Sequence, residues 1–250
     1  MRTHIYRLAL SVLFLSALMS CRRDEAPQRR SDARSTIDHL VIKEIFYTGH
    51  AYTQNFPKEY NQSAVQNWYS DDAYITIYNP SKQTLYLDSM AIVTNQIDPR
   101  VIFEFAPGDN FVNSYYGVNS IMCFPGKGHD YPVKPGQTIV IANHAIDHAK
   151  DYEKYLDDNG ENLKEYEGID QFLDLSKADF EWSPSTDKNN NPNVPDLMPI
   201  TPGRAMSTIS EAVGLALVRL PWSPATFAQF EKRDAEADKK AKVKNPIHYI

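Results

Sequence analysis

Short apolar runs separated by turn residues dominate the chain from residue 38 onward. The stretch AYITIYNPS alternates, so Ile75 and Ile77 share one face of an expected strand, and its Asn-Pro-Ser end predicts a turn. Further strands are expected at 40–47, 84–93, 100–105, 137–143 and 213–220. Many short strands with Gly, Pro and Asn between them predict a β-sandwich or barrel, and the lack of alternating long helices argues against a parallel α/β sheet.

Two segments break the β pattern. Residues 144–158 have a helical pattern, with Asn143 placed to cap the helix and Asn159 and Gly160 placed to end it. Residues 225–243 also have a helical pattern, but their mixed charges and few apolar positions are typical of a solvated helix. The chain ends in the apolar fragment PIHYI, which suggests that the sheet continues in a longer relative and that this chain is shortened.

The N-terminus has the pattern of an export signal. Arg2 and Arg7 precede an apolar run at 8–19, which is shorter than the ~20 residues that a membrane-spanning helix needs. The run ends in Leu-Met-Ser-Cys, which resembles the bacterial lipobox, and this resemblance implies cleavage before Cys21 and lipid attachment to it. We therefore expect a lipoprotein signal peptide at 1–20 and a lipid anchor with a flexible tether at 21–37. An ordinary or uncleaved signal with an incidental Cys21 is the alternative.

Composition and charge narrow the possible partners. Removal of residues 1–20 takes away Arg2 and Arg7 and no acid, which leaves 24 basic and 32 acidic residues, a net charge of −8. Binding of nucleic acid depends on phosphate neutralisation, so this charge argues against a nucleic-acid partner. With Cys21 acylated to the bilayer, Cys123 has no intramolecular partner, and its apolar surroundings predict a buried, unreactive thiol.

Four segments resemble the lamin-tail type of immunoglobulin-like domain. They are LVIKEIFY, DDAYITIYNPSKQTLYLDSMAIV, YPVKPGQTIVIAN and VGLALVRL, in that order along the chain. The residues that match the family pattern in the second segment are Asp72, Tyr74, Ile75, Ile77, Tyr78, Asn79, Pro80, Ser81, Leu85 and Leu87. Lys43 and Thr76 depart from it. The resemblance implies an immunoglobulin-like β-sandwich over residues 38–222, followed by a charged helical segment at 223–250.

Two further segments, NHAIDHAKDY and LDLSKADFEW, resemble an uncharacterised group of Bacteroidota-type surface lipoproteins. Members of this group often accompany TonB-dependent outer-membrane receptors. The resemblance therefore implies a place on the outer membrane, facing the cell surface, and a role in ligand capture or uptake. It implies no catalytic residues, because none are known for the group.

The best candidate for metal chemistry is the helical pair His144 and His148. An i, i+4 spacing places two imidazoles on one helix face, at a separation that suits two ligands of one metal, and Asp151 shares that face. The alternative is two exposed polar residues on a surface helix. No resident cofactor is expected from the sequence, while metal and haem stay open as ligands.

Aromatic residues are the better candidates for partner binding. The chain has 15 Tyr and 3 Trp, and the pairs Trp68–Tyr69 and Tyr115–Tyr116 fall in polar stretches. Tyr and Trp are favoured at interfaces because they bury much area and keep a polar group. The alternative is that these residues belong to strands or to the core.

These observations lead to one main hypothesis and two alternatives. The main hypothesis is a non-catalytic outer-membrane lipoprotein that captures a ligand, such as iron, haem or a peptide, for a TonB-dependent receptor. The first alternative is a structural or adhesive surface protein. The second is a metal-dependent hydrolase that uses His144 and His148.

Overall fold

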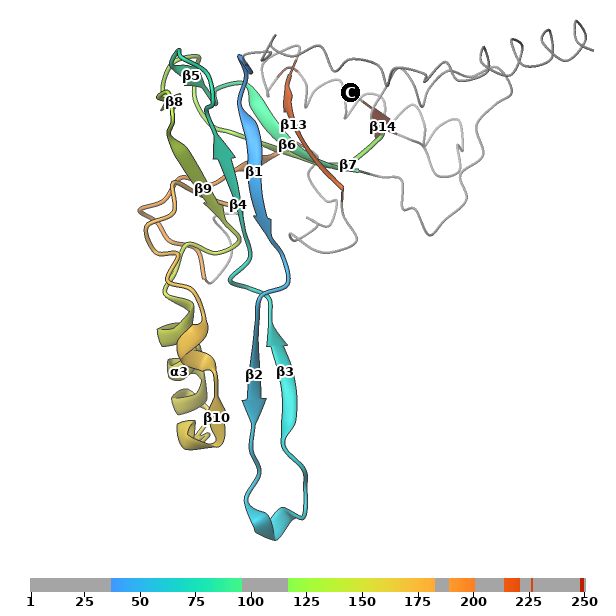
Figure 1. Cartoon of the computed structure of the whole chain (residues 1–250), viewed down its shortest axis with the longest axis vertical. Helices are drawn as coiled ribbons and strands as arrows, with labels where there is room; N and C mark the ends of the chain where they lie inside the picture. The colour runs from blue at the N-terminus through green and yellow to red at the C-terminus, as the bar shows by residue number, and fades with distance from the viewer. Residues whose placement is uncertain are drawn as a thin grey trace, which may run out of the picture. The chain divides into compact units, whose positions relative to one another are not determined.

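The computed structural model describes residues 37–95, 117–182, 189–200, 214–220, 226 and 248–249. The chain divides into two units, Met1–Thr36 and Ile37–Ile250, and every described residue lies in the second. The described part is mainly β and contains several sheets (Figure 1), as the strand pattern predicts. No helix in this part is both long enough and apolar enough to cross a membrane. The signal peptide, the strand at 100–105 and, apart from Thr226, the C-terminal helix lie outside the described residues.

The first sheet confirms three of the expected strands. It contains, in spatial order, β1 (Val41–Phe46), β4 (Tyr74–Tyr78), β9 (Thr138–Ala142) and β11 (Phe180–Glu181). The first three are antiparallel neighbours, with Ile75 opposite both Ile45 and Ile141, and β11 runs parallel to β9.

A second sheet of five strands is built around β6 and β7. It contains β12 (Met198–Pro199), β7 (Gly117–Cys123), β6 (Met90–Asn95), β13 (Leu215–Arg219) and β14 (His248–Tyr249), with β14 also paired to β7. A small ladder joins β5 (Leu85–Tyr86) to β8 (Pro132–Val133). The expected strand at 84–93 is therefore two strands that belong to different sheets.

The two larger sheets share one hydrophobic core. Ile75 and Ile77 from the first sheet and Ile92 and Met122 from the second are fully buried in the same cluster. Alternate residues of β6 and β7 enter a second cluster, which includes Val93 and other buried apolar residues. The β6–β7 sheet is therefore buried on both faces, and each fully buried Ile or Met side chain contributes about 1.5–3 kcal/mol.

Cys123 ends β7 inside the second cluster. It is a free cysteine with no exposed surface, and burial raises the pKa of its thiol to about 12. The predicted burial of this thiol is confirmed.

One long hairpin extends beyond the first sheet. β2 (His50–Gln54) follows β1, β3 (Val65–Tyr69) precedes β4, and these pairs form consecutive antiparallel ladders. A short 3₁₀ turn, η1 (Lys58–Tyr60), lies in the segment that connects β2 to β3. In Figure 1 the β2–β3 part continues away from β1 and β4, and β10 (Tyr166–Glu167) pairs with β2.

The inserted helix is shorter than its pattern predicts. The helix α3 spans His148–Asp158, so the expected start at residue 144 is wrong. Asp147 is the N-cap, and its side chain accepts a hydrogen bond from the backbone N–H of Lys150. The preceding segment is held in a non-helical course, because the N–H of Ala145 donates to the buried carboxylate of Glu181.

An aromatic cluster joins α3 to the hairpin. Leu156 of α3 is buried with Ile169 of η3 (Ile169–Gln171) and with Phe172, and η2 (Leu163–Glu165) also contacts α3. Partly buried side chains complete this cluster: Tyr52, Tyr69, Ala149, Tyr152 and Tyr166. Tyrosine rings from β2, from β3 and from the helix itself therefore take part in attaching the helix to the hairpin.

Candidate binding groove

A groove of about 340 Å³ lies beside the aromatic cluster. It is lined by Tyr69, Asp71, Asp151, Tyr152, Lys154, Tyr155, Asp158 and Asn189. Most of these residues come from α3 or from the end of β3 and the turn that follows it. The volume lies at the lower end of the range for small-ligand pockets.

The Tyr69 side chain is fixed by packing. Its ring stacks on Phe172 with centroids 4.2 Å apart and planes 9° apart. A second ring, Tyr152, packs against it in a T-shaped arrangement with the ring centroids 5.4 Å apart. Since stacked and edge-to-face arrangements are both favourable geometries for aromatic pairs, the position of this groove wall is set by the cluster.

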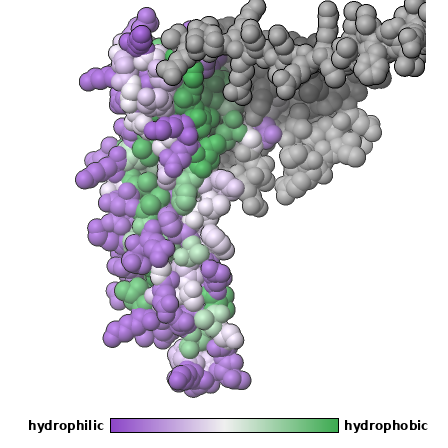
Figure 2. All heavy atoms as spheres, in the orientation of Figure 1, coloured by the Kyte–Doolittle hydropathy of each residue, from purple (hydrophilic) through white to green (hydrophobic). Residues whose placement is uncertain are grey.

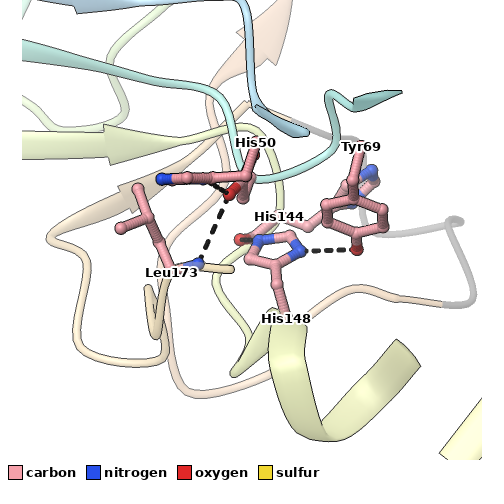
Figure 3. Close-up of polar contacts among 6 residues, drawn as sticks. His50, Tyr69, His144, His148 and Leu173 are labelled. Carbon is pink, nitrogen blue, oxygen red and sulfur yellow. Dashed lines mark hydrogen bonds and ion pairs between the residues drawn. The ribbon is translucent and has the colours of Figure 1, made fainter. Parts of the chain in front are cut away.

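A hydrogen-bond chain continues from Tyr69 into the protein (Figure 3). The ring nitrogen Nε2 of His148 lies 3.0 Å from the carbonyl oxygen of His144, which can only accept, so Nε2 carries the proton. Burial, the largest influence, lowers the pKa of His148, so the ring is neutral near pH 7 and Nδ1 accepts. Tyr69 therefore donates its hydroxyl proton to Nδ1, at an oxygen-to-nitrogen distance of 2.8 Å.

A second buried contact lies where the two ladders of the hairpin meet. The carboxylate of Asp72 is fully buried and lies 2.6 Å from Nδ1 of His50, which donates to it. It also accepts a hydrogen bond of 3.3 Å from the backbone N–H of Leu173. Asp72 therefore connects the start of β2, the start of β4 and the segment after η3.

The groove has a negative balance of charge. Lys154 is paired with Asp158, with nitrogen-to-oxygen distances of 2.9 and 2.7 Å. Asp71 and Asp151 are exposed, and neither forms an ion pair with a described residue. The pKa of Tyr69 lies well above its usual value, first because the hydroxyl is buried and then because of these carboxylates, so Tyr69 stays protonated.

The arrangement differs from the metal site that the sequence suggested. Among the described residues no three His, Cys, Asp or Glu side chains come together to hold a metal. Both ring nitrogens of His148 are engaged, and His144 precedes the helix, so the expected pair on one helix face is not formed.

The other expected site residues have separate outcomes. Tyr69 and Asp151 line the groove, and His148 accepts the hydrogen bond of the Tyr69 hydroxyl. Trp68 lies on β3 next to Tyr69, and because successive strand residues face opposite sides, it is directed away from the cluster, with 64% of its surface exposed. Cys21, Tyr115 and Tyr116 lie outside the described residues.

The sequence interpretation missed six of the eight groove residues, namely Asp71, Tyr152, Lys154, Tyr155, Asp158 and Asn189. A pattern was present for two of them, because Tyr155 and Asp158 follow Asp151 at i+4 and i+7 and so share one face of α3 with it. Asp71 gave no comparable indication, because only the folded hairpin brings its turn beside the helix.

Comparison with solved structures finds one similar fold. It is the crystal structure of a DUF4876 family protein from Bacteroides thetaiotaomicron VPI-5482, with a TM-score of 0.54 and 21% sequence identity. The match covers 74% of this chain and 43% of that protein, so the present chain corresponds to less than half of its neighbour. No protein-family model matches the chain, and comparison with curated proteins finds no significant match.

Proposed function

We propose that this protein is a lipid-anchored, non-catalytic binding module of the outer membrane that captures a ligand for a TonB-dependent receptor. The observation that carries the binding role is the groove between α3 and the end of β3, with tyrosine rings and two carboxylates that form no ion pair within the described residues. The lipobox-like residues before Cys21 support the anchor. The similarity to a protein from a Bacteroides species is compatible with a Bacteroidota-type surface protein.

We further propose that the β part is a lamin-tail-like immunoglobulin domain. The four matching sequence segments correspond to β1, to β4 through β6, to β8 and β9, and to β13. The turn after β4 supports the match, because the buried side chain of Asn79 donates to the carbonyls of Gln83 and Val133 and accepts from Ser81. In such a domain, this network would be the structural role of the Asn-Pro-Ser segment, because it holds the turn after β4 in place.

The anchor is tested by labelling growing cells with a radioactive fatty acid. We expect the wild-type protein to incorporate label and to fractionate with the outer membrane, and Cys21→Ser to do neither. Cys123→Ala is the matched control, because it removes the other cysteine and leaves the lipobox-like segment intact. Label retained by Cys21→Ser, or label lost by Cys123→Ala, contradicts the proposed anchor.

The receptor role is tested by crosslinking intact cells and identifying outer-membrane proteins that co-purify with the chain. We expect a TonB-dependent receptor to be recovered with the wild-type protein and to be lost with Cys21→Ser. Surface accessibility is measured on the same cells with an external protease. Recovery of abundant porins alone contradicts the receptor proposal.

A structural or adhesive role is the second candidate, and exposed aromatic residues of the hairpin favour it. Trp68 is exposed on the face of β3 that is directed away from the aromatic cluster, and Tyr60 is exposed in η1. Trp and Tyr often anchor protein contacts. Loss of cell–cell or cell–surface attachment in Trp68→Ser cells, with receptor co-purification unchanged, favours this candidate.

A further inference from the structure

We propose that the groove binds an organic cation, namely the alkylammonium or guanidinium group of a lysine, an arginine or a polyamine. This inference rests on the proposed binding function and adds the chemical class of the ligand. Three properties of the groove support it: two carboxylates without an ion-pair partner among the described residues, the tyrosine side chains that line it, and the contacts that hold Tyr69 and Tyr152, here called its floor, in place.

The charge of the groove selects against anions. Three carboxylates line it, and its single lysine is paired with Asp158. Asp71 and Asp151 are left without an ion-pair partner among the described residues, one on the turn after β3 and one on the first turn of α3. Figure 2 shows that hydrophilic residues cover most of the visible surface over α3. A cation in the groove therefore meets two available carboxylates from two separate elements.

The aromatic walls favour an organic cation over a hydrated metal ion. Tyr69, Tyr152 and Tyr155 all line the groove, and Tyr155 is 55% exposed. The face of a tyrosine ring attracts ammonium and guanidinium groups, while its carbon surface contacts their alkyl chains. Metal ions need several converging oxygen or nitrogen ligands, and the described residues provide no group of three acidic, His or Cys side chains of that kind.

The floor of the groove is rigid before any ligand binds. Tyr69 is stacked on Phe172 and hydrogen-bonded to His148, and the Tyr152 hydroxyl donates to Tyr52 at 2.8 Å. Two of the three tyrosine rings that line the groove are therefore already held in place, whereas Tyr155 is 55% exposed. Preorganisation of this kind lowers the entropic cost of binding.

The proposal is tested by isothermal titration calorimetry on the full chain, purified in a non-ionic detergent at low salt. The probes are 1,5-diaminopentane, the blocked tripeptide acetyl-Gly-Arg-Gly-amide, and glutarate, which has the length of the diamine and the opposite charge. We expect at least one of the two cationic probes to bind and glutarate not to bind. Binding of the diamine alone indicates a free amine as the natural ligand, and binding of the tripeptide alone indicates a basic peptide.

Variants test whether the binding occurs in this groove. We expect Asp71→Asn and Asp151→Asn each to weaken binding about fivefold, which is the loss of one partly exposed ion pair. Asp157→Asn is the matched control, because it makes the same change of charge on an exposed α3 residue that does not line the groove. Tyr155→Phe should retain affinity, whereas Tyr155→Leu should lose about threefold.

The results separate this inference from the function on which it rests. No binding of either cation, or an equal loss in Asp157→Asn and Asp151→Asn, overturns the ligand class. If a receptor still co-purifies with the chain in that case, the binding-module proposal stands and only the ligand class is wrong. If the cations bind and no receptor is recovered, the ligand class stands and the receptor proposal is wrong.

Discussion

The hydrogen bond from Tyr69 to His148 gives the sharpest test of how the groove floor is held. Tyr69→Phe removes only the hydroxyl, so the ring can keep its stacking on Phe172 at 4.2 Å. The change leaves Nδ1 of His148 as a buried acceptor without a donor. The other ring nitrogen cannot relieve this, because it must keep its proton to donate to the carbonyl of His144.

The expected cost follows from that buried acceptor. An unsatisfied buried polar group costs about 1–3 kcal/mol, whereas replacing both partners by apolar groups of similar shape can be close to neutral. Tyr69→Phe should therefore lower the free energy of unfolding by about 1–3 kcal/mol, and the melting temperature by about 2–4 °C for each kcal/mol in a domain of this size. His148→Leu should also destabilise, and the double variant should cost less than the sum of the two single variants.

The measurement is urea unfolding followed by tryptophan fluorescence for the wild type and the three variants. An unchanged slope with a lower midpoint identifies a change in stability rather than a change in the compactness of either state. A coupling energy above about 0.5 kcal/mol supports the direct contact. Additive effects of the two single changes, or a Tyr69→Phe protein as stable as the wild type, would falsify the reasoning.

Four other predictions follow from buried groups and one glycine. Burial lowers the pKa of His148, so below about pH 6.5 the unfolded chain takes up a proton that the folded chain does not. The free energy of unfolding should therefore fall by up to about 1.4 kcal/mol per pH unit. Urea unfolding at pH 7.5 and 5.5 should show a smaller fall for His148→Gln than for the wild type. Burial opposes ionisation of Asp88, but hydrogen bonds from three backbone N–H groups hold its pKa below the usual value. The ionised carboxylate therefore stabilises the fold above about pH 3.9, and this stabilisation is lost as the pH falls through the folded pKa. Asp88→Asn should lower the free energy of unfolding by about 1.5–3 kcal/mol at pH 7 and by less at pH 3. Cys123, with its thiol pKa at about 12, should react with a disulfide reagent at pH 8 only at the rate of unfolding. Gly49→Ala should destabilise by about 1–3 kcal/mol, because φ is +68° and a Cβ there would overlap the Tyr69 carbonyl; thermal unfolding measures it.

The sequence predicts the strands β1, β4, β9 and β13 well because aliphatic residues form much of each strand. Ile75 and Ile77 alternate with polar or aromatic neighbours, and both are fully buried in β4. The strands β2 and β3 were missed for the opposite reason. Their buried side carries Tyr52 and Tyr69 rather than Val or Ile, and the segments HAYTQ and VQNWY are polar enough to be taken for loops. Hydrophobic alternation is a weak guide where tyrosine forms the apolar face.

The start of α3 illustrates a different limit. Asn143 and Asp147 are equally good N-cap residues by type, so the local sequence allows either. The choice is made by a distant residue, because the buried carboxylate of Glu181 accepts the Ala145 N–H and keeps that segment out of the helix. The expected metal pair depended on a helix that begins at residue 144. Because the helix begins four residues later, His144 does not share a helix face with His148.

The groove depends on contacts that no local pattern contains. It brings the end of β3 together with α3 and the segment after η3, which lie far along the chain: Tyr69 and His148 are 79 residues apart, and Asp72 and Leu173 are 101 apart. The same aromatic cluster that attaches the helix to the hairpin also places Tyr69 and Tyr152 at the groove wall. Stability of this cluster and affinity of the groove are therefore coupled. A change such as Tyr69→Phe, which leaves every carboxylate of the groove in place, should weaken ligand binding in proportion to the loosening of the floor, whereas Asp71→Asn should weaken binding without loss of stability.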